Sequence, residues 1–452
     1  MYMRSGQVWL QHDPYQCISC CLPCLATEPQ CVDLRLGFGQ TQNMNKNSEV
    51  RMNPLIERLV CSKTGDEVPH NDFRKPIGLS PAGAPVEVRY DIDAVRTELD
   101  KVPFSARSTP GMWRYAPLLP VSDVPLHFAA DVGGTPVFPH PELSQDLGGT
   151  VFLKNEGANP TGSFKDRGLA MAIALGTACG ARQFCLPTQG NAGVAGAFFS
   201  RRMGVEPCIV HMPEGYQDGV YHRSAAFLGA EVEFFGENIA ATGKRMREAV
   251  AERLASGELV DISTFFEPGR LEGKKTMGLE IVEHFKNEPL PDYIFYPTGG
   301  GTGLVGIWKA FSELKALGLL TGALPKMVAV QSERCDPVVR SFEQGLDIVE
   351  PVQSQGTVAD GMDVPGAIMG HGIIRVLRES GGTAIAVSEV DIIEAYTIYG
   401  QLGIPGGYES AATWAAAKAM KARGDLVSGS SVLLLNTGSH LIPIGQARSA
   451  AA

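Results

Sequence analysis

The sequence has 452 residues, of which 44% are hydrophobic and 19% charged, as in ordinary globular proteins. This length predicts two or three domains. The net charge of −10 argues against a nucleic-acid-binding surface. The sequence contains no run of about twenty apolar residues, so we expect no membrane span. No secretory signal is recognised at the N-terminus, so we expect a cytoplasmic protein.

Residues 1–51 differ in composition from the rest of the chain. The polar stretch 40–48 predicts a poorly ordered segment, and we assign residues 1–115 to an irregular, partly disordered N-terminal extension. Paired cysteines can form a zinc ribbon, but the second pair is missing because Cys61 stands alone. The N-terminal cysteines, for which a degenerate remnant of a zinc site and an intact zinc site are the two alternatives, are Cys17, Cys20, Cys21, Cys24 and Cys31.

Beyond about residue 116, short apolar segments alternate with helical patterns. This alternation predicts an α/β protein with mostly parallel sheets, in which ligands bind at the carboxyl ends of the strands. The expected strands are 151–154, 183–187, 207–211, 231–235, 259–262, 293–296, 327–331, 383–387 and 432–436. A long, charged helix is expected after residue 235. Isolated cysteines that we expect to be buried are Cys179, Cys185, Cys208 and Cys335.

Lys165 follows the first of these strands. It stands in Asn159-Pro160-Thr161-Gly162-Ser163-Phe164-Lys165-Asp166-Arg167-Gly168, directly before an Ala-rich helical run. The pattern places its amine at a helix N-terminus, with Ser163 as the expected capping hydroxyl. The helix dipole disfavours a cation there, and a lowered pKa suits a lysine that forms a Schiff base. The alternative is an ordinary exposed lysine at a loop–helix junction.

A glycine-rich loop follows the strand at 293–296. Thr298-Gly299-Gly300-Gly301-Thr302-Gly303 leads into a helix, so its backbone N–H groups can converge on a phosphate. A mononucleotide site is disfavoured, since the GxxxxGK[ST] motif is absent. A tight packing turn is the other alternative for such a loop.

The ten-residue lysine string resembles the cofactor-lysine motif of threonine synthases, which are pyridoxal phosphate (PLP) enzymes of the tryptophan-synthase-β-like fold. The resemblance extends from about Arg89 to Ser439. It implies two open, mostly parallel twisted sheets with flanking helices. It also implies a large PLP-binding domain at 116–163 and 270–445 and a small domain at 164–269.

The resemblance also implies roles for individual residues. Lys165, next to Phe164, holds the cofactor and then serves as acid and base. Asn191 binds the phenolic oxygen of the cofactor, and Thr437 faces the pyridine nitrogen. The segment Thr188, Gln189 and Gly190 binds the substrate carboxylate. The residues implied to bind the cofactor phosphate are Gly299, Gly300, Gly301, Thr302 and Gly303.

A second signature concerns the substrate. Glu267-Pro268-Gly269-Arg270-Leu271-Glu272-Gly273-Lys274-Lys275-Thr276 resembles the family's NPxRxEGQKT, in which Arg270 would bind a distal phosphate. The alternative is a solvated charge cluster at a helix start. The resemblance therefore implies the conversion of O-phospho-L-homoserine and water to L-threonine and phosphate. It further implies a homodimer, and we predict no metal in the site.

Several residues depart from the family pattern. Thr264-Phe265 replaces an Asn-Ser pair, Ala192 replaces a phosphate-binding threonine, and Gly406-Gly407-Tyr408-Glu409-Ser410 replaces a Glu-Pro/Gly-type segment. Lost hydroxyl and amide donors weaken phosphate recognition. A β-elimination or β-replacement enzyme therefore remains an alternative, as in threonine/serine dehydratases, diaminopropionate lyases or cysteate-synthase-like enzymes. A non-enzymatic PLP-binding paralogue is the third alternative.

Overall fold

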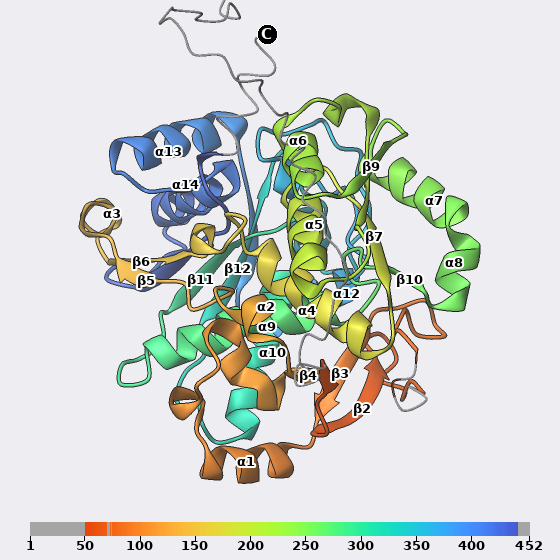
Figure 1. Ribbon diagram of the computed structural model, residues 1–452. Coiled ribbons are helices and arrows are strands. Elements are labelled where there is room, and N and C mark those ends of the chain that lie inside the picture. Colours follow the sequence, from red (N-terminus) through yellow and green to blue (C-terminus); the bar gives the residue numbers. More distant parts are fainter. Residues whose placement is uncertain (1–49, 70–72, 74, 442–452) are drawn as a thin grey trace, which may run out of the picture. The chain divides into compact units, whose positions relative to one another are not determined.

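The computed structural model describes residues 50–69, 73 and 75–441 (Figure 1). The predicted remnant of a zinc site at Cys17–Cys31 and the polar stretch 40–48 lie outside the described residues. Every feature below belongs to one compact unit, Asn47–Ala452.

The larger of two parallel sheets has six strands in the order β13-β12-β11-β14-β6-β5. Only the edge pair β5 and β6 is antiparallel. Central strands such as β14 are apolar along their length, because helices cover both faces of the sheet. The strands are β5 (Val137–Pro139), β6 (Thr150–Asn155), β11 (Tyr293–Pro297), β12 (Lys326–Ser332), β13 (Thr383–Val387) and β14 (Ser431–Asn436).

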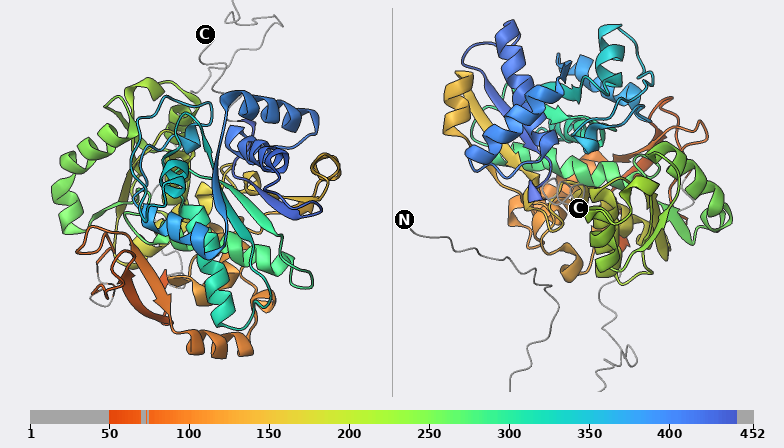
Figure 2. Two further views of the ribbon diagram at one scale, coloured as in Figure 1. Left: turned by 180° about the vertical axis from the view of Figure 1, so that it is seen from behind. Right: turned by 90° about the horizontal axis from the view of Figure 1, so that it is seen from above.

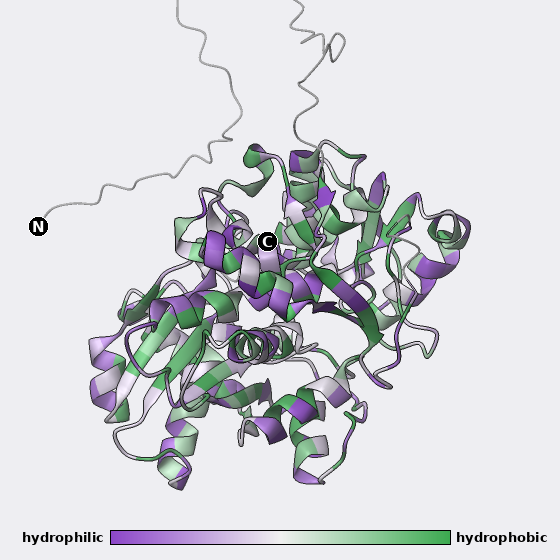
Figure 3. Cartoon of the chain, turned by 90° about the horizontal axis from the view of Figure 1, so that it is seen from below, coloured by the Kyte–Doolittle hydropathy of each residue, from purple (hydrophilic) through white to green (hydrophobic). Residues whose placement is uncertain are grey.

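The two faces of this sheet contribute to separate hydrophobic cores. Alternate side chains of β11 divide between them, since Ile294 and Tyr296 join one core and Phe295 the other. In Figure 2, the C-terminal helices lie on one side of the sheet, and Figure 3 shows apolar residues concentrated on the strands. The helices on one face are α9 (Gly269–His284), α10 (Thr302–Ala316), α11 (Pro337–Glu343) and α12 (Gly370–Glu379), and those on the other are α3 (Pro141–Leu147), α13 (Glu389–Gln401) and α14 (Tyr408–Arg423).

The smaller sheet has four parallel strands in the order β10-β7-β8-β9. They are β7 (Gln183–Pro187), β8 (Ile209–Met212), β9 (Glu231–Phe234) and β10 (Leu259–Asp261). The helices of this region are α4 (Lys165–Ala178), α5 (Asn191–Met203), α6 (Val220–Phe227), α7 (Ile239–Ala249) and α8 (Ala251–Ser256). The long charged helix expected after residue 235 is therefore two helices, because Val250 leaves helical geometry at φ −111° and ψ 18°.

The described residues before 130 form short elements that pack on the larger core. They are β1 (Arg51–Met52), β2 (Ile56–Cys61), β3 (Val86–Tyr90), β4 (Val121–Asp123), α1 (Ile92–Lys101) and α2 (Leu126–Ala129). Strand β1 pairs with β4, and β2 pairs with β3. The α/β class with two mostly parallel sheets is confirmed. The domain boundaries stay a prediction, although all strands of the smaller sheet fall within 164–269.

Four cysteines expected to be buried do lie in the interior, and burial raises the pKa of each thiol. They are Cys179, Cys185, Cys208 and Cys335. None of the helices in the described part of the chain is long and apolar enough to cross a membrane.

Buried ion pairs join the elements beneath the carboxyl ends of the strands. Lys154 of β6 contacts Glu280 of α9 at 2.8 Å. Arg167 of α4 contacts Glu280 at 2.7 Å and Glu156 at 2.6 Å. Burial alone would raise the pKa of the Glu280 carboxyl, but Arg167 and Lys154 hold it below its ordinary value. Each buried charge in this network has an opposite partner.

A second buried network joins α9 to α10. Lys275 contacts Glu272 at 2.6 Å and Glu313 at 2.9 Å, and Lys309 contacts the same two carboxylates at 2.5 Å and 2.9 Å. The Tyr90 hydroxyl of β3 donates to Glu272 at 2.8 Å. We refer to these two networks together as the framework ion pairs.

Candidate active site

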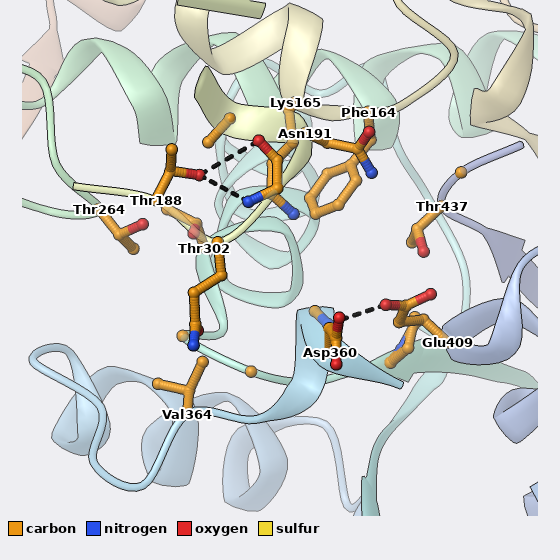
Figure 4. A pocket seen from close by; sticks show the side chains of 18 of the residues that line it. Phe164, Lys165, Thr188, Asn191, Thr264, Thr302, Asp360, Val364, Glu409 and Thr437 are labelled. Carbon is orange, nitrogen blue, oxygen red and sulfur yellow. Dashed lines mark hydrogen bonds between the residues drawn. The ribbon is translucent and has the colours of Figure 1, made fainter. Parts of the chain in front are cut away.

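Most of the predicted site residues line one pocket at the carboxyl ends of the parallel strands (Figure 4). Only Gly303 is absent from its lining; a Cβ there would meet the Tyr296 hydroxyl at 2.0 Å, so this glycine permits close packing. The predicted residues that line the pocket are Phe164, Lys165, Thr188, Gln189, Gly190, Asn191, Arg270, Gly299, Gly300, Gly301, Thr302 and Thr437.

Lys165 is the first residue of α4, as the sequence predicts. The N-cap is Phe164, which makes no side-chain cap, whereas the Ser163 hydroxyl accepts the Lys165 amide at 3.3 Å. Burial lowers the pKa of the Lys165 amine to about 8, helped by the charge of Arg270 and opposed by Glu409. Its Nζ lies 4.0 Å from the centroid of the Phe164 ring. The amine is therefore partly deprotonated near neutral pH, mainly because it is buried.

Thr188 lies in the loop after β7, and Asn191 is the first residue of α5. The Thr188 hydroxyl accepts the Gly190 amide at 3.0 Å, and the Thr188 amide donates to the His211 carbonyl at 2.8 Å. Two of the backbone amides expected to bind a carboxylate are thus already engaged within the protein. The Gln189 amide and the first amides of α5 remain as donors, since a helix N-terminus has no internal acceptors for them. The Asn191 Oδ1 is buried with no hydrogen-bond partner.

The glycine loop connects β11 to α10. Gly301 has φ +74°, which favours glycine. A Cβ on Gly299 would lie 2.6 Å from the Gly361 carbonyl oxygen. Because side chains are excluded at these positions, the backbone reaches the pocket directly. The loop ends at the N-terminus of α10, where backbone N–H groups favour an anion.

Thr437 directly follows β14 and is held through its backbone. Its carbonyl accepts the Phe164 amide at 3.0 Å, and its amide donates to the Ser410 hydroxyl at 3.1 Å. The hydroxyl side chain faces the pocket, opposite Thr264 in Figure 4. This arrangement places a neutral hydroxyl in the lining, on the same side of the pocket as the Glu409 carboxylate.

Arg270 lies in the first turn of α9 and is 2% exposed. Its Nη1 donates to the Ile262 carbonyl at 2.9 Å, and its Nε has no hydrogen-bond partner. Burial lowers the pKa of this guanidinium to about 10, whereas the nearby Glu267 favours its charge. The alternative of a solvated charge cluster at this helix start does not hold, because Arg270, Glu272, Lys274 and Lys275 are buried.

The departures from the family pattern differ in their relation to the pocket. Thr264 and Ala192 line it. Phe265 instead has φ +67° and is 2% exposed within the hydrophobic core, outside the pocket lining. The Thr264 hydroxyl is therefore the side chain that this segment offers to a ligand.

Other lining residues were not assigned a role from the sequence: Lys274, Tyr221, Asp360, Val364 and Glu409. Glu409 accepts the Gly361 amide at 2.8 Å, and Figure 4 shows Asp360 and Glu409 on the same side of the pocket. One difference in the sequence could have pointed to Lys274, because the signature NPxRxEGQKT has glutamine at the position of this lysine. The pocket thus combines buried cations on α4 and α9 with carboxylates from the segments around 360 and 409.

These features fit the phosphorylated pyridine cofactor that the resemblance implies. The glycine loop offers backbone donors to a phosphate, Lys165 offers a nucleophilic amine, and Asn191 has an unused amide oxygen. The described residues contain no group of three or more His, Cys, Asp or Glu side chains arranged to hold a metal ion.

Comparisons with known proteins agree with this fit. The family model described as pyridoxal-phosphate dependent enzyme matches residues 129–438. The chain is 30% identical to the threonine synthase of Methanosarcina acetivorans over 361 residues, which are 79% of this chain and 85% of the relative. It is 29% identical to the threonine synthase of Methanocaldococcus jannaschii over 392 residues, covering 86% and 93% of the two chains.

Solved structures show the same fold. A threonine deaminase from T.th. matches with a TM-score of 0.56 and 26% identity, over 68% of this chain and 92% of that one. Maize serine racemase matches with a TM-score of 0.58 and 20% identity, over 70% and 92%.

Proposed function

We propose that this chain, which belongs to the family of pyridoxal-phosphate-dependent enzymes, is a threonine synthase acting on O-phospho-L-homoserine. In this reaction the bond between Cγ and the phosphate oxygen breaks, water adds to Cβ, and L-threonine and phosphate are released. Relatives named threonine synthase match most of the chain and support the proposal.

The observation that carries the proposal is that the buried Arg270 side chain has no carboxylate partner. Its guanidinium lines the pocket, is buried, and makes no ion pair with a carboxylate of the described residues. Arg270 Nε also lacks a hydrogen-bond partner. A guanidinium binds phosphate through charge-assisted hydrogen bonds, so a substrate phosphate would satisfy it. The Thr264 hydroxyl is the neighbouring donor that we assign to the same phosphate.

We assign the remaining roles as follows. Lys165 holds the cofactor and moves protons at the substrate's Cα and Cβ, for which its pKa of about 8 is suitable. Pyridoxal phosphate supplies the electron sink that makes these protons acidic. Asn191 and Thr437 orient the cofactor ring. The Gln189 amide and the N-terminus of α5 bind the substrate carboxylate.

A second candidate is β-elimination of water from L-serine or L-threonine, after which hydrolysis of the released imine gives a 2-oxo acid and ammonia. Two observations favour it: Ala192 lines the pocket without a hydroxyl, and a solved relative at 26% identity is a threonine deaminase. The homodimer implied by the resemblance stays a prediction.

Product analysis distinguishes the candidates. PLP-loaded protein is given O-phospho-L-homoserine, L-serine or L-threonine in parallel, and inorganic phosphate, amino acids, 2-oxo acids and ammonia are measured. We expect threonine and equimolar phosphate from the first substrate only. Ammonia and a 2-oxo acid from serine or threonine, with phosphohomoserine inert, would support the second candidate. Normal cofactor loading without any turnover would favour the non-enzymatic paralogue.

A further inference from the structure

Lys274 is a buried lysine that lines the pocket. Burial, together with the charges of Arg270 and Lys165, lowers the pKa of its amine well below the ordinary value. Lys274 lies on α9 and is 2% exposed. Its Nζ donates to the Thr302 hydroxyl at 3.1 Å and lies 4.8 Å from the centroid of the Phe164 ring. No carboxylate of the described residues lies within ion-pair distance of this amine. The amine therefore stands beside the glycine loop with only a neutral oxygen as its partner.

Three other lysines are also buried, and each has a carboxylate partner. Lys154 contacts Glu280 at 2.8 Å, while Lys275 and Lys309 contact Glu272 at 2.6 Å and 2.5 Å. Burying an ammonium without an opposite charge is costly, so such a group is normally paired. The described residues supply no such counter-charge to Lys274, so an anion bound in the pocket would favour the charged form of this amine.

The environment of the amine indicates what this anion is. Thr302 is the first residue of α10, whose N-terminal amides favour an anion. Gly299 and Gly301 allow no side chain to fill the adjacent space.

We propose that the Lys274 ammonium binds a phosphate monoester seated at the N-terminus of α10, beside Thr302. Its place next to the glycine loop favours the cofactor phosphate, and the substrate phosphate is the other source of the same chemistry. The inference rests on the site that the proposed function uses, but it does not depend on which amino acid is converted.

Binding of PLP and of pyridoxal to the apoprotein tests the proposal, because the two ligands differ only in the phosphate. Dissociation constants are measured by fluorescence titration for the wild type, Lys274→Gln and Lys274→Met. We expect both variants to bind PLP at least about tenfold more weakly, as loss of a charge-assisted contact predicts, and pyridoxal with unchanged affinity. Lys315→Gln on the outer part of α10 is the matched control and should change neither constant.

A separate kinetic measurement tests whether Lys274 binds the substrate phosphate instead of the cofactor phosphate. If PLP affinity is unchanged but the KM for O-phospho-L-homoserine rises at least tenfold in Lys274→Gln, with kcat retained, the phosphate monoester is the substrate's. Equal loss of PLP and pyridoxal binding would overturn the proposal, since the lysine would then not recognise phosphate. Unchanged PLP affinity together with an unchanged KM would overturn it as well. None of the titration results depends on turnover, so failure of the proposed reaction is recognised independently.

Thermal unfolding of the apoprotein separates binding from a structural role. Lys274→Met removes a buried amine that has no charged partner, so we expect a Tm equal to or above that of the wild type. Lys275→Met leaves Glu272 and Glu313 without one of their cations and should lower the Tm. A fall in Lys274→Met as large as that in Lys275→Met would show that Lys274 is a structural residue and would contradict the proposal.

Discussion

The cations of the framework ion pairs and those of the pocket both lie inside the protein, but their neighbouring charges differ. Burial disfavours the charged form of Arg167, yet Glu156 and Glu280 outweigh it and raise the pKa of its guanidinium. Burial lowers the pKa of Arg270 to about 10 and that of Lys165 to about 8, because their carboxylate neighbours are too few or too distant to compensate. Lys275 lies between these cases, since its pKa is lowered despite two carboxylates.

The difference shows what each region does. A cation with a carboxylate partner holds the helices together, and a cation without one is available to a ligand. The framework ion pairs include residues of α4 and α9, the helices that also carry the pocket cations. The framework ion pairs thus neutralise their own charges, whereas the positive charges of the pocket are available to an anionic ligand.

The largest expected effect comes from Lys165→Ala. Removing the amine should abolish the visible absorbance of the protein-bound cofactor and lower turnover by at least about a thousandfold. The fold should survive, because Lys165 forms no framework ion pair. Absorbance spectra, turnover and circular dichroism are measured together; persistence of the visible band would show that another lysine holds the cofactor.

Removing one partner of a framework ion pair should instead lower the free energy of unfolding. Glu280→Ala leaves Lys154 and Arg167 short of a buried counter-charge, so we expect a loss of about 3–5 kcal/mol in the free energy of unfolding. Urea denaturation measures this. Asp347→Ala is the control, because its pair with Arg378 is exposed and should contribute about 0–1 kcal/mol. Similar losses in the two variants would remove the distinction between framework and surface pairs.

The pH dependence of cofactor attachment sharpens the comparison. With a Lys165 pKa of about 8, lowered from 10.5, the rate of attachment to the apoprotein should rise with pH up to about 8 and then level off. In Arg270→Met the midpoint should move upward, since a nearby positive charge is removed. The folded chain holds this proton less tightly than the unfolded chain, so the lysine's contribution to stability increases as pH rises from about 8 to 10.5. A midpoint near 10.5 in the wild type would contradict the assigned environment.

The smallest expected effect concerns the glycine loop. Gly301→Ala forces a Cβ onto a residue with φ +74° and brings it 2.3 Å from Ile373 Cδ1. The strain should cost about 1–2 kcal/mol and weaken PLP binding roughly tenfold. Gly318→Ala has a similar φ of +77° but open space around it, so it should strain the backbone without changing PLP affinity. Equal weakening in both variants would show that the effect is not local to the site.

Local patterns in the sequence predict much of this molecule. Apolar strand segments such as 183–187 and 383–387 agree with the structure to the residue, since buried parallel strands leave a strong signal. The lysine motif, the glycine loop and the Asn191 loop could be placed at strand ends because each combines turn residues with a following helix. These features depend on neighbours in the chain.

Features that depend on residues distant in the chain could not be predicted. The pairing of Lys154 with Glu280 spans 126 positions and has no local pattern. Phe265 looks like a changed ligand residue, yet its positive φ turns the side chain into the core. Lys274 and Lys275 are adjacent and chemically identical, and only the structure shows that one faces carboxylates and the other the pocket.

Lys165 and Lys274 both lie against the Phe164 ring, so identifying the amine that holds the cofactor tests the site most directly. The PLP-loaded protein is treated with borohydride, which fixes the cofactor to that amine, and the modified peptide is identified by mass spectrometry. We predict that the cofactor is found on Lys165 alone. Modification of Lys274, or of any other lysine, would contradict the assignment of the pocket and the division of its cations.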